Sequence, residues 1–89
     1  MRLDLYLKKT GVVRQRSVAK EICDAGAASV NGRPAKPGQS LRPGDRIDLR
    51  LARRALALRV LDIPHGNLAK RDVPRYVEVV SDTEIDPVD

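Results

Sequence analysis

The apolar residues of this chain change their spacing between Gly26 and Ser29, and this change limits the folds available to it. Before Gly26 they recur every three or four residues, as on one face of a helix. After Ser29 they alternate with polar residues, as along a strand with one buried face. A length of 89 residues allows one domain with one modest core. The sequence therefore predicts an α+β domain, with two helices packed on a small antiparallel sheet.

Two short helices are predicted in the first third of the chain. The segment 3–10 has apolar residues at i, i+3 and i+4 and is followed by Gly11, a typical helix stop. A second helix is predicted from Ser17, whose hydroxyl makes a favourable N-cap, to Gly26. Tyr6 lies on the apolar face of the first helix, so we expect it in the core.

The strands are predicted from alternation and from turn signals. Asn31-Gly32 is a strong signal for a two-residue hairpin turn between short arms. Alternating residues over 46–51, an apolar run over 55–63 and a final segment over 76–80 are expected as strands. The predicted order is two helices followed by four strands. The residues expected to be buried in the sheet include Val30, Ile47, Leu49 and Leu58.

Charge is distributed unevenly along the chain. All 17 basic residues lie at or before Arg75 together with only seven acidic ones, so residues 1–75 carry a net charge of +10. The last fourteen residues carry −5. A basic body is typical of a protein that binds a polyanion. We expect one domain over 1–80, and a flexible acidic tail over 81–89 that reduces non-specific contacts.

The sequence argues against catalysis and against a metal site. It holds one histidine, His65, in a Pro-His-Gly turn, and one cysteine, Cys23, which we expect in the core. These residues supply no nucleophile and base, and the acidic residues lack the spacing of a calcium loop. We therefore expect no enzyme, no metal and no cofactor.

The single cysteine and the absence of long apolar runs indicate where the protein is located in the cell. A lone cysteine forms no internal disulfide, and the chain has no apolar run long enough for a signal peptide or a membrane span. We expect a cytoplasmic protein that does not bind membranes.

A group of cations surrounds the predicted start of the second helix. Arg14 and Arg16 precede Ser17, and Lys20 follows one turn later. The helix dipole disfavours cations at this end, so their placement there indicates an anion between them and the free N–H groups. The alternative is a solvated cluster of charges with no ligand.

The first helix adds further charge. Arg2, Lys8 and Lys9 share a face with the first group if the two helices pack side by side. Asp4 is expected to complement the helix dipole or to orient Arg2, and not to contact the ligand.

A series of short motifs runs from Met1 to Leu51, more than half of the chain. The motifs are Arg2-Leu3-Asp4, Arg14-x-Arg16-Ser17-x-Ala19-Lys20, Gly26, Val30-Asn31-Gly32, Lys36 and Pro43-Gly44-Asp45. In this order and at these spacings the series resembles the S-four RNA-binding domain, named after a small-subunit ribosomal protein. The resemblance implies the αL motif, in which two helices and a hairpin loop present a basic face to structured RNA.

The resemblance and the charge pattern together select the residues expected to bind RNA. They are Arg2, Lys8, Lys9, Arg14, Arg16, Ser17 and Lys20 on the helices, with Asn31 and Lys36 near the hairpin edge. The chain has two tyrosines and no other aromatic residue, so base stacking on the sheet is a poor explanation. Recognition is expected through RNA shape and phosphates.

Among stand-alone members of this family, the chain most resembles the bacterial ribosome-quality-control factors that hold P-site tRNA and the ribosome-associated heat-shock proteins. The acidic C-terminal end favours the first group, because the second carries a longer basic extension. The resemblance implies large-subunit rRNA as the partner, with P-site peptidyl-tRNA as a further one. We expect a monomer when the protein is off the ribosome.

Two other functions remain open at this point. One is a protein-interaction module that binds a partner through the charged face of the sheet, at Arg46, Asp48, Arg50 and Arg59. The other is a general binder of structured RNA with no role in ribosome rescue. The salt dependence of binding separates the first of these from an RNA-binding protein.

Overall fold

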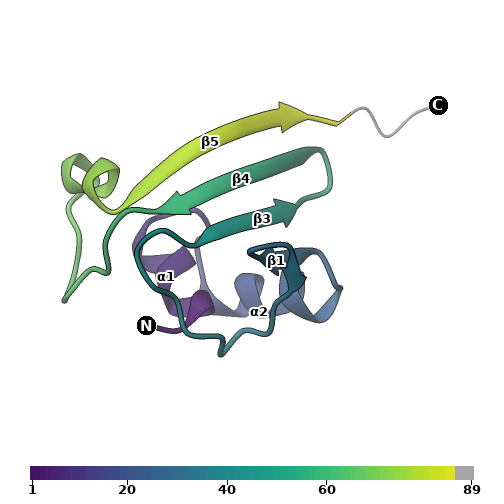
Figure 1. Cartoon of the computed structure of the whole chain (residues 1–89), viewed down its shortest axis with the longest axis horizontal. Coiled ribbons are helices and arrows are strands. Elements are labelled where there is room, and N and C mark those ends of the chain that lie inside the picture. The colour runs from purple at the N-terminus through teal and green to yellow at the C-terminus, as the bar shows by residue number, and fades with distance from the viewer. Residues whose placement is uncertain (86–89) are drawn as a thin grey trace.

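In the computed structural model, which describes residues 1–85, two helices precede a five-stranded sheet (Figure 1). The helices are α1 (Leu3–Lys9) and α2 (Arg16–Asp24). The strands are β1 (Ala28–Val30), β2 (Arg33–Pro34), β3 (Arg46–Arg50), β4 (Arg54–Val60) and β5 (Val77–Glu84), with a 3-10 helix, η1 (Lys70–Arg75), before β5. The predicted α+β class is confirmed.

The helices differ from the prediction only at their ends. α1 buries its apolar face, and the hydroxyl of Tyr6, which is fully buried, donates to the carbonyl of Tyr76 at 2.5 Å. The prediction of Ser17 as the N-cap of α2 is wrong, because the helix begins at Arg16 and its N-cap lies two residues before Ser17. Gln15 has an extended backbone and is the N-cap, and its carbonyl accepts from the Val18 N–H at 3.1 Å. Within residues 1–85, no helix has the length and apolar character needed to cross a bilayer.

The sheet is antiparallel throughout, with the strand order β2-β1-β3-β4-β5. Asn31 and Gly32 have φ values of +52° and +83°, as a type I′ hairpin turn requires, so the predicted turn is confirmed. The second arm of this hairpin pairs with β1 as a separate strand. The sheet therefore has five strands where four were predicted.

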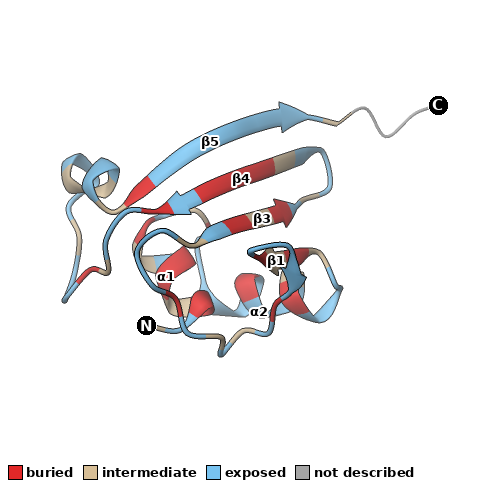
Figure 2. Cartoon of the chain, in the orientation of Figure 1, coloured by how far each residue is buried: buried red, intermediate tan, exposed pale blue. Residues whose placement is uncertain are grey.

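One face of the sheet and the apolar faces of both helices form a single core. Val30, Ile47, Leu49 and Leu58 are each at most 3% exposed, as predicted. Figure 2 shows the buried positions on β1, β3, β4, α1 and α2, whereas almost all of β5 is exposed. Cys23 is buried in the same core, and burial raises the pKa of its thiol.

The C-terminal strand is longer than predicted. β5 continues four residues past Val80, so the prediction of a flexible tail is wrong for residues 81–84. These residues pair with β4, and Arg54 forms an ion pair with Asp82 at 2.7 Å. β4 in turn ends at Val60, three residues earlier than predicted. The rest of the predicted tail, residues 86–89, lies outside the described residues.

Candidate nucleic-acid interface

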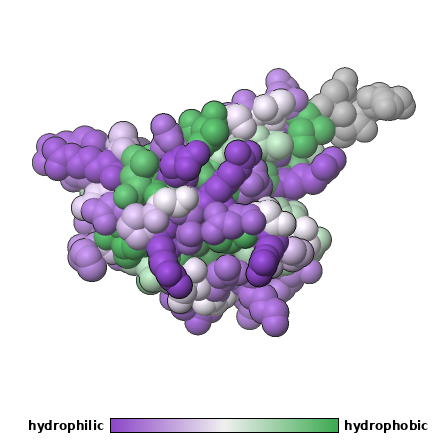
Figure 3. Space-filling view, in the orientation of Figure 1, coloured by the Kyte–Doolittle hydropathy of each residue, from purple (hydrophilic) through white to green (hydrophobic). Residues whose placement is uncertain are grey.

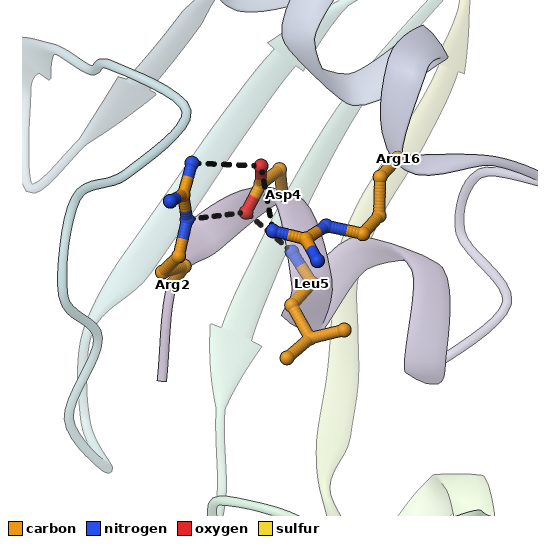
Figure 4. Close-up of polar contacts among 4 residues, drawn as sticks. All are labelled: Arg2, Asp4, Leu5 and Arg16. Atoms are coloured by element: carbon orange, nitrogen blue, oxygen red, sulfur yellow. Dashed lines mark hydrogen bonds and ion pairs between the residues drawn. The ribbon is translucent and has the colours of Figure 1, made fainter.

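A buried carboxylate joins the N-terminal ends of the two helices (Figure 4). Asp4 is 4% exposed, and its oxygens accept two hydrogen bonds from the guanidinium of Arg2, both at 3.1 Å. They also accept from the Leu5 N–H at 2.8 Å and from Arg16 at 3.4 Å. The expectation that Asp4 orients Arg2 is confirmed. Asp4 also orients Arg16, which the sequence did not predict.

The cluster keeps a net positive charge. Burial by itself raises the pKa of Asp4, but the hydrogen bonds from Arg2 and the Leu5 N–H and the charges of Arg16 and Arg2 outweigh it, so the pKa lies below its usual value. The carboxylate is therefore ionised at neutral pH between two guanidiniums. The side chains of Arg2 and Arg16 remain 56% and 45% exposed, so part of each guanidinium still faces solvent. This arrangement presents two oriented cations to an anion.

The two helix N-termini differ in how their N–H groups are used. In α1, the Leu3 N–H donates to the carbonyl of Gln39 at 2.8 Å, and the Asp4 N–H donates to that of Pro37 at 3.0 Å. In α2, no side chain caps the helix, and the Ser17 hydroxyl instead contacts the side chain of Gln15 at 3.3 Å. The N-terminus of α2 is therefore the one that offers N–H groups to an anion.

Several predicted residues gather around this end. Lys20 follows Arg16 by one helical turn and shares its face of α2, and Arg14 is exposed two residues before the helix. Within residues 1–85, neither Arg14 nor Lys20 forms an ion pair. Lys36 is exposed next to Pro37, whose carbonyl accepts from α1. Arg14, Arg16 and Lys20 therefore lie at the start of α2 or one turn along it, and Arg2 is joined to Arg16 through Asp4, whereas Lys36 lies beside the start of α1.

The other two predicted cations of α1 lie apart from this group. Lys8 and Lys9 are at the C-terminal end of the helix, roughly 10 Å from its start for seven residues. The ammonium of Lys9 donates to the carbonyl of Gly66 at 2.7 Å, while Lys8 is exposed. No sequence signal predicts the contacts made by Pro37, Gln39 and Gly66, because backbone carbonyls contribute them.

Asn31 is engaged within the protein. Its amide donates to the carboxylate of Asp45 at 3.0 Å, and its side-chain oxygen accepts from the Arg46 N–H at 2.9 Å. These bonds join the hairpin turn to the start of β3. The predicted role of Asn31 in RNA binding stays a prediction, and the contacts seen favour a structural role.

Asn31→Ala is expected to lower the free energy of unfolding by about 2–3 kcal/mol, because alanine is strained at positive φ and both hydrogen bonds are lost. Asn31→Gly is the control, since glycine tolerates this backbone conformation and loses only the hydrogen bonds. Urea denaturation measures both changes. RNA affinity should be unaffected, and a loss of more than about fivefold in the folded glycine variant would place Asn31 in the interface.

The charges on the outer face of the sheet are mostly paired. Arg46 contacts Asp48 at 3.1 Å, and Arg59 contacts Glu78 at 3.5 Å. Of the four residues considered for a protein-docking face, Arg50 alone forms no ion pair with a described residue. In the described part of the chain, no group of three or more His, Cys, Asp or Glu residues is arranged to hold a metal ion.

Comparison with known proteins identifies the family. The model of the S4 domain, the S-four domain of the sequence analysis, matches residues 1–47. The RQC P-site tRNA stabilizing factor of Streptococcus pneumoniae is 35% identical over 86 residues, which cover 97% of each chain. The protein of the same name in Bacillus subtilis is 35% identical over 63 residues, which cover 71% of this chain and 73% of that protein.

A solved structure has the same fold. The trimeric structure of heat shock protein 15 from Vibrio cholerae superposes with a TM-score of 0.81, covering 91% of this chain and 82% of the other. At 23% identity this likeness concerns the fold alone. The sequence matches carry the assignment further: the chain belongs to the S4 domain family and, along nearly its whole length, to the family of the RQC P-site tRNA stabilizing factors.

Proposed function

We propose that this chain binds RNA of the ribosome, namely large-subunit rRNA together with P-site tRNA, and acts in the quality control of stalled ribosomes. The observation that carries the proposal is the pair of arginines, Arg2 before α1 and Arg16 at the start of α2, that Asp4 holds beside a helix end with no side-chain cap. Relatives that match over most of the chain are named for P-site tRNA and for ribosome quality control.

The chemistry of this end suits a phosphate backbone. Guanidinium groups bind phosphate oxygens through two parallel N–H donors, and free N–H groups at a helix N-terminus add further donors. Fixing Arg2 and Arg16 before RNA arrives reduces the entropy lost on binding. The function proposed is binding without catalysis, by a protein that acts in the cytoplasm and is a monomer off the ribosome.

The proposal is tested by sedimenting the protein with purified large ribosomal subunits over a series of salt concentrations. With about four phosphates contacted, the logarithm of the affinity should fall with the logarithm of salt concentration with a slope near −3 to −4. Small subunits serve as the comparison and should bind more weakly. A flat salt dependence would contradict the proposal and favour protein docking through the sheet face.

A further inference from the structure

The segment that joins β4 to β5, residues 61–76, lies beyond the part of the chain that the S4 model matches. It is fixed to α1 at two points, from Lys9 to Gly66 at 2.7 Å and from Tyr6 to Tyr76 at 2.5 Å. Pro64 in this segment is fully buried, and Ile63 and Val73 pack against the core. The segment therefore holds its side chains in a defined position relative to α1.

This segment carries positive charge that no acidic residue within 1–85 neutralises through an ion pair. Lys70, Arg71 and Arg75 of η1 are exposed, and none forms an ion pair with any residue in 1–85. Of the two acidic residues here, Asp72 is half-buried, and the carboxylate of Asp62 accepts from a backbone N–H at 2.8 Å. The arginines of the sheet differ, since three of them are paired with carboxylates.

A groove lies between α1 and this segment. It has a volume of about 280 Å³ and is lined by Leu5, Lys8, Lys9, Asn67 and Leu68. Lys8, Lys9 and Asn67 carry hydrogen-bond donors, one of which, on Lys9, already donates to the carbonyl of Gly66, and no carboxylate lines the groove. Such a lining suits a phosphate group.

The surface around the groove favours nucleic acid over protein. A protein interface has an apolar centre, but residues 61–76 expose a single large apolar side chain, that of Leu61 at the start of the segment. Figure 3 shows hydrophilic side chains over the end of the molecule where Figure 1 places η1. The unpaired cations and the donor-lined groove are the features that contact with an RNA backbone requires.

We infer that the RNA-binding surface continues from the α1–α2 end, across the groove at Lys8 and Lys9, onto η1, where Lys70 and Arg71 bind further phosphates. The inference rests on the proposed function and extends its contact area to a segment outside the S4 match. α1 runs from the α1–α2 end to the groove at Lys8 and Lys9, so a single RNA contacts the α1–α2 end and η1 together.

The test is the double change Lys70→Ala and Arg71→Ala, compared with Arg50→Ala and Arg53→Ala. Both pairs are exposed, lack ion pairs within residues 1–85, and lower the net charge by two. Binding to purified large ribosomal subunits should weaken about 10- to 100-fold in the η1 variant, with a salt slope shallower by about two units. The control should change less than about threefold. Urea denaturation of both variants verifies that they fold.

Equal losses in the two variants would overturn the inference, because they would reflect total charge alone. The proposed function is judged separately by Arg14→Ala with Arg16→Ala. If that variant loses binding while the η1 variant matches the control, the extension is wrong and the proposed function stands. If neither variant loses binding, the extension and the proposed function are both wrong. Asn67→Asp tests the groove itself, and unchanged affinity in this variant would exclude a phosphate there.

Discussion

Replacing Arg14 and Arg16 together by alanine is expected to abolish co-sedimentation with large ribosomal subunits at physiological salt. Each charge-assisted phosphate contact contributes about 1–3 kcal/mol, so losing two costs about 2–6 kcal/mol of binding free energy. Over most of this range the affinity falls by at least about 100-fold. The protein should remain folded, because both side chains are exposed and Asp4 keeps its two hydrogen bonds from Arg2 when the longer contact from Arg16, at 3.4 Å, is lost. Arg16→Ala alone should cost about 1–3 kcal/mol of binding and one unit of salt slope.

The matched control is Arg50→Ala on the outer face of the sheet. Arg50 is also exposed and forms no ion pair within residues 1–85, so Arg50→Ala removes from a different surface the same single charge that Arg16→Ala removes. Binding should be retained. If Arg50→Ala had the larger effect, the helix surface would have to be abandoned and the binding site placed on the sheet.

The fold could be predicted where burial sets the sequence pattern. The helical spacing in α1, the Asn31-Gly32 turn and the alternation along β3 each follow from one buried face, and the structure confirms all three. The prediction ended β5 four residues too early. All residues of this strand after Val77 are exposed, so no apolar alternation marks its second half in the sequence. An exposed edge strand and a polar tail have the same composition, and pairing with β4 distinguishes them only in the structure.

The sequence predicted which cations belong to the candidate site, but not how the backbone arranges them. Cations placed against the helix dipole selected Arg14, Arg16 and Lys20, and all three are exposed at the start of α2 or along it. The capping of α1 by the carbonyls of Pro37 and Gln39 has no residue signature, and it decides which helix end stays open. Asparagine is suited both to turns and to RNA contacts, so the sequence did not separate these roles for Asn31.

Asp4→Asn is expected to lower the free energy of unfolding at pH 7 by about 2–3 kcal/mol. Asparagine keeps an oxygen for the Leu5 N–H, but it loses the charge and turns an amide donor toward guanidiniums that are themselves donors. The loss stays below that of a fully buried ion pair because Arg2 and Arg16 are about half exposed. Urea denaturation of the two proteins measures it.

The stabilisation that the Asp4 carboxylate provides depends on pH, and the direction of its pKa shift determines how. The folded-state pKa of Asp4 lies below its usual value, so as pH falls the unfolded chain takes up the proton first. The carboxylate's contribution is complete above the unfolded-state pKa of about 3.9 and is lost as pH falls through the lower folded-state pKa. The stability difference between wild type and Asp4→Asn should therefore be constant from pH 7 to about 5 and shrink below pH 4. A difference that persists at low pH would contradict this assignment.

RNA binding by the same variant separates charge from orientation. Asp4→Asn raises the net charge by one, so charge alone would strengthen binding to RNA and steepen its salt dependence. Loss of the carboxylate also frees Arg2 and Arg16 to leave the positions in which Asp4 holds them, and their ordering then opposes binding. We expect the second effect to dominate, with affinity for large subunits falling about three- to tenfold, because immobilising two long side chains costs about 0.5–1.5 kcal/mol each. Tighter binding by the folded variant would show that Asp4 restrains the arginines without preparing them for RNA.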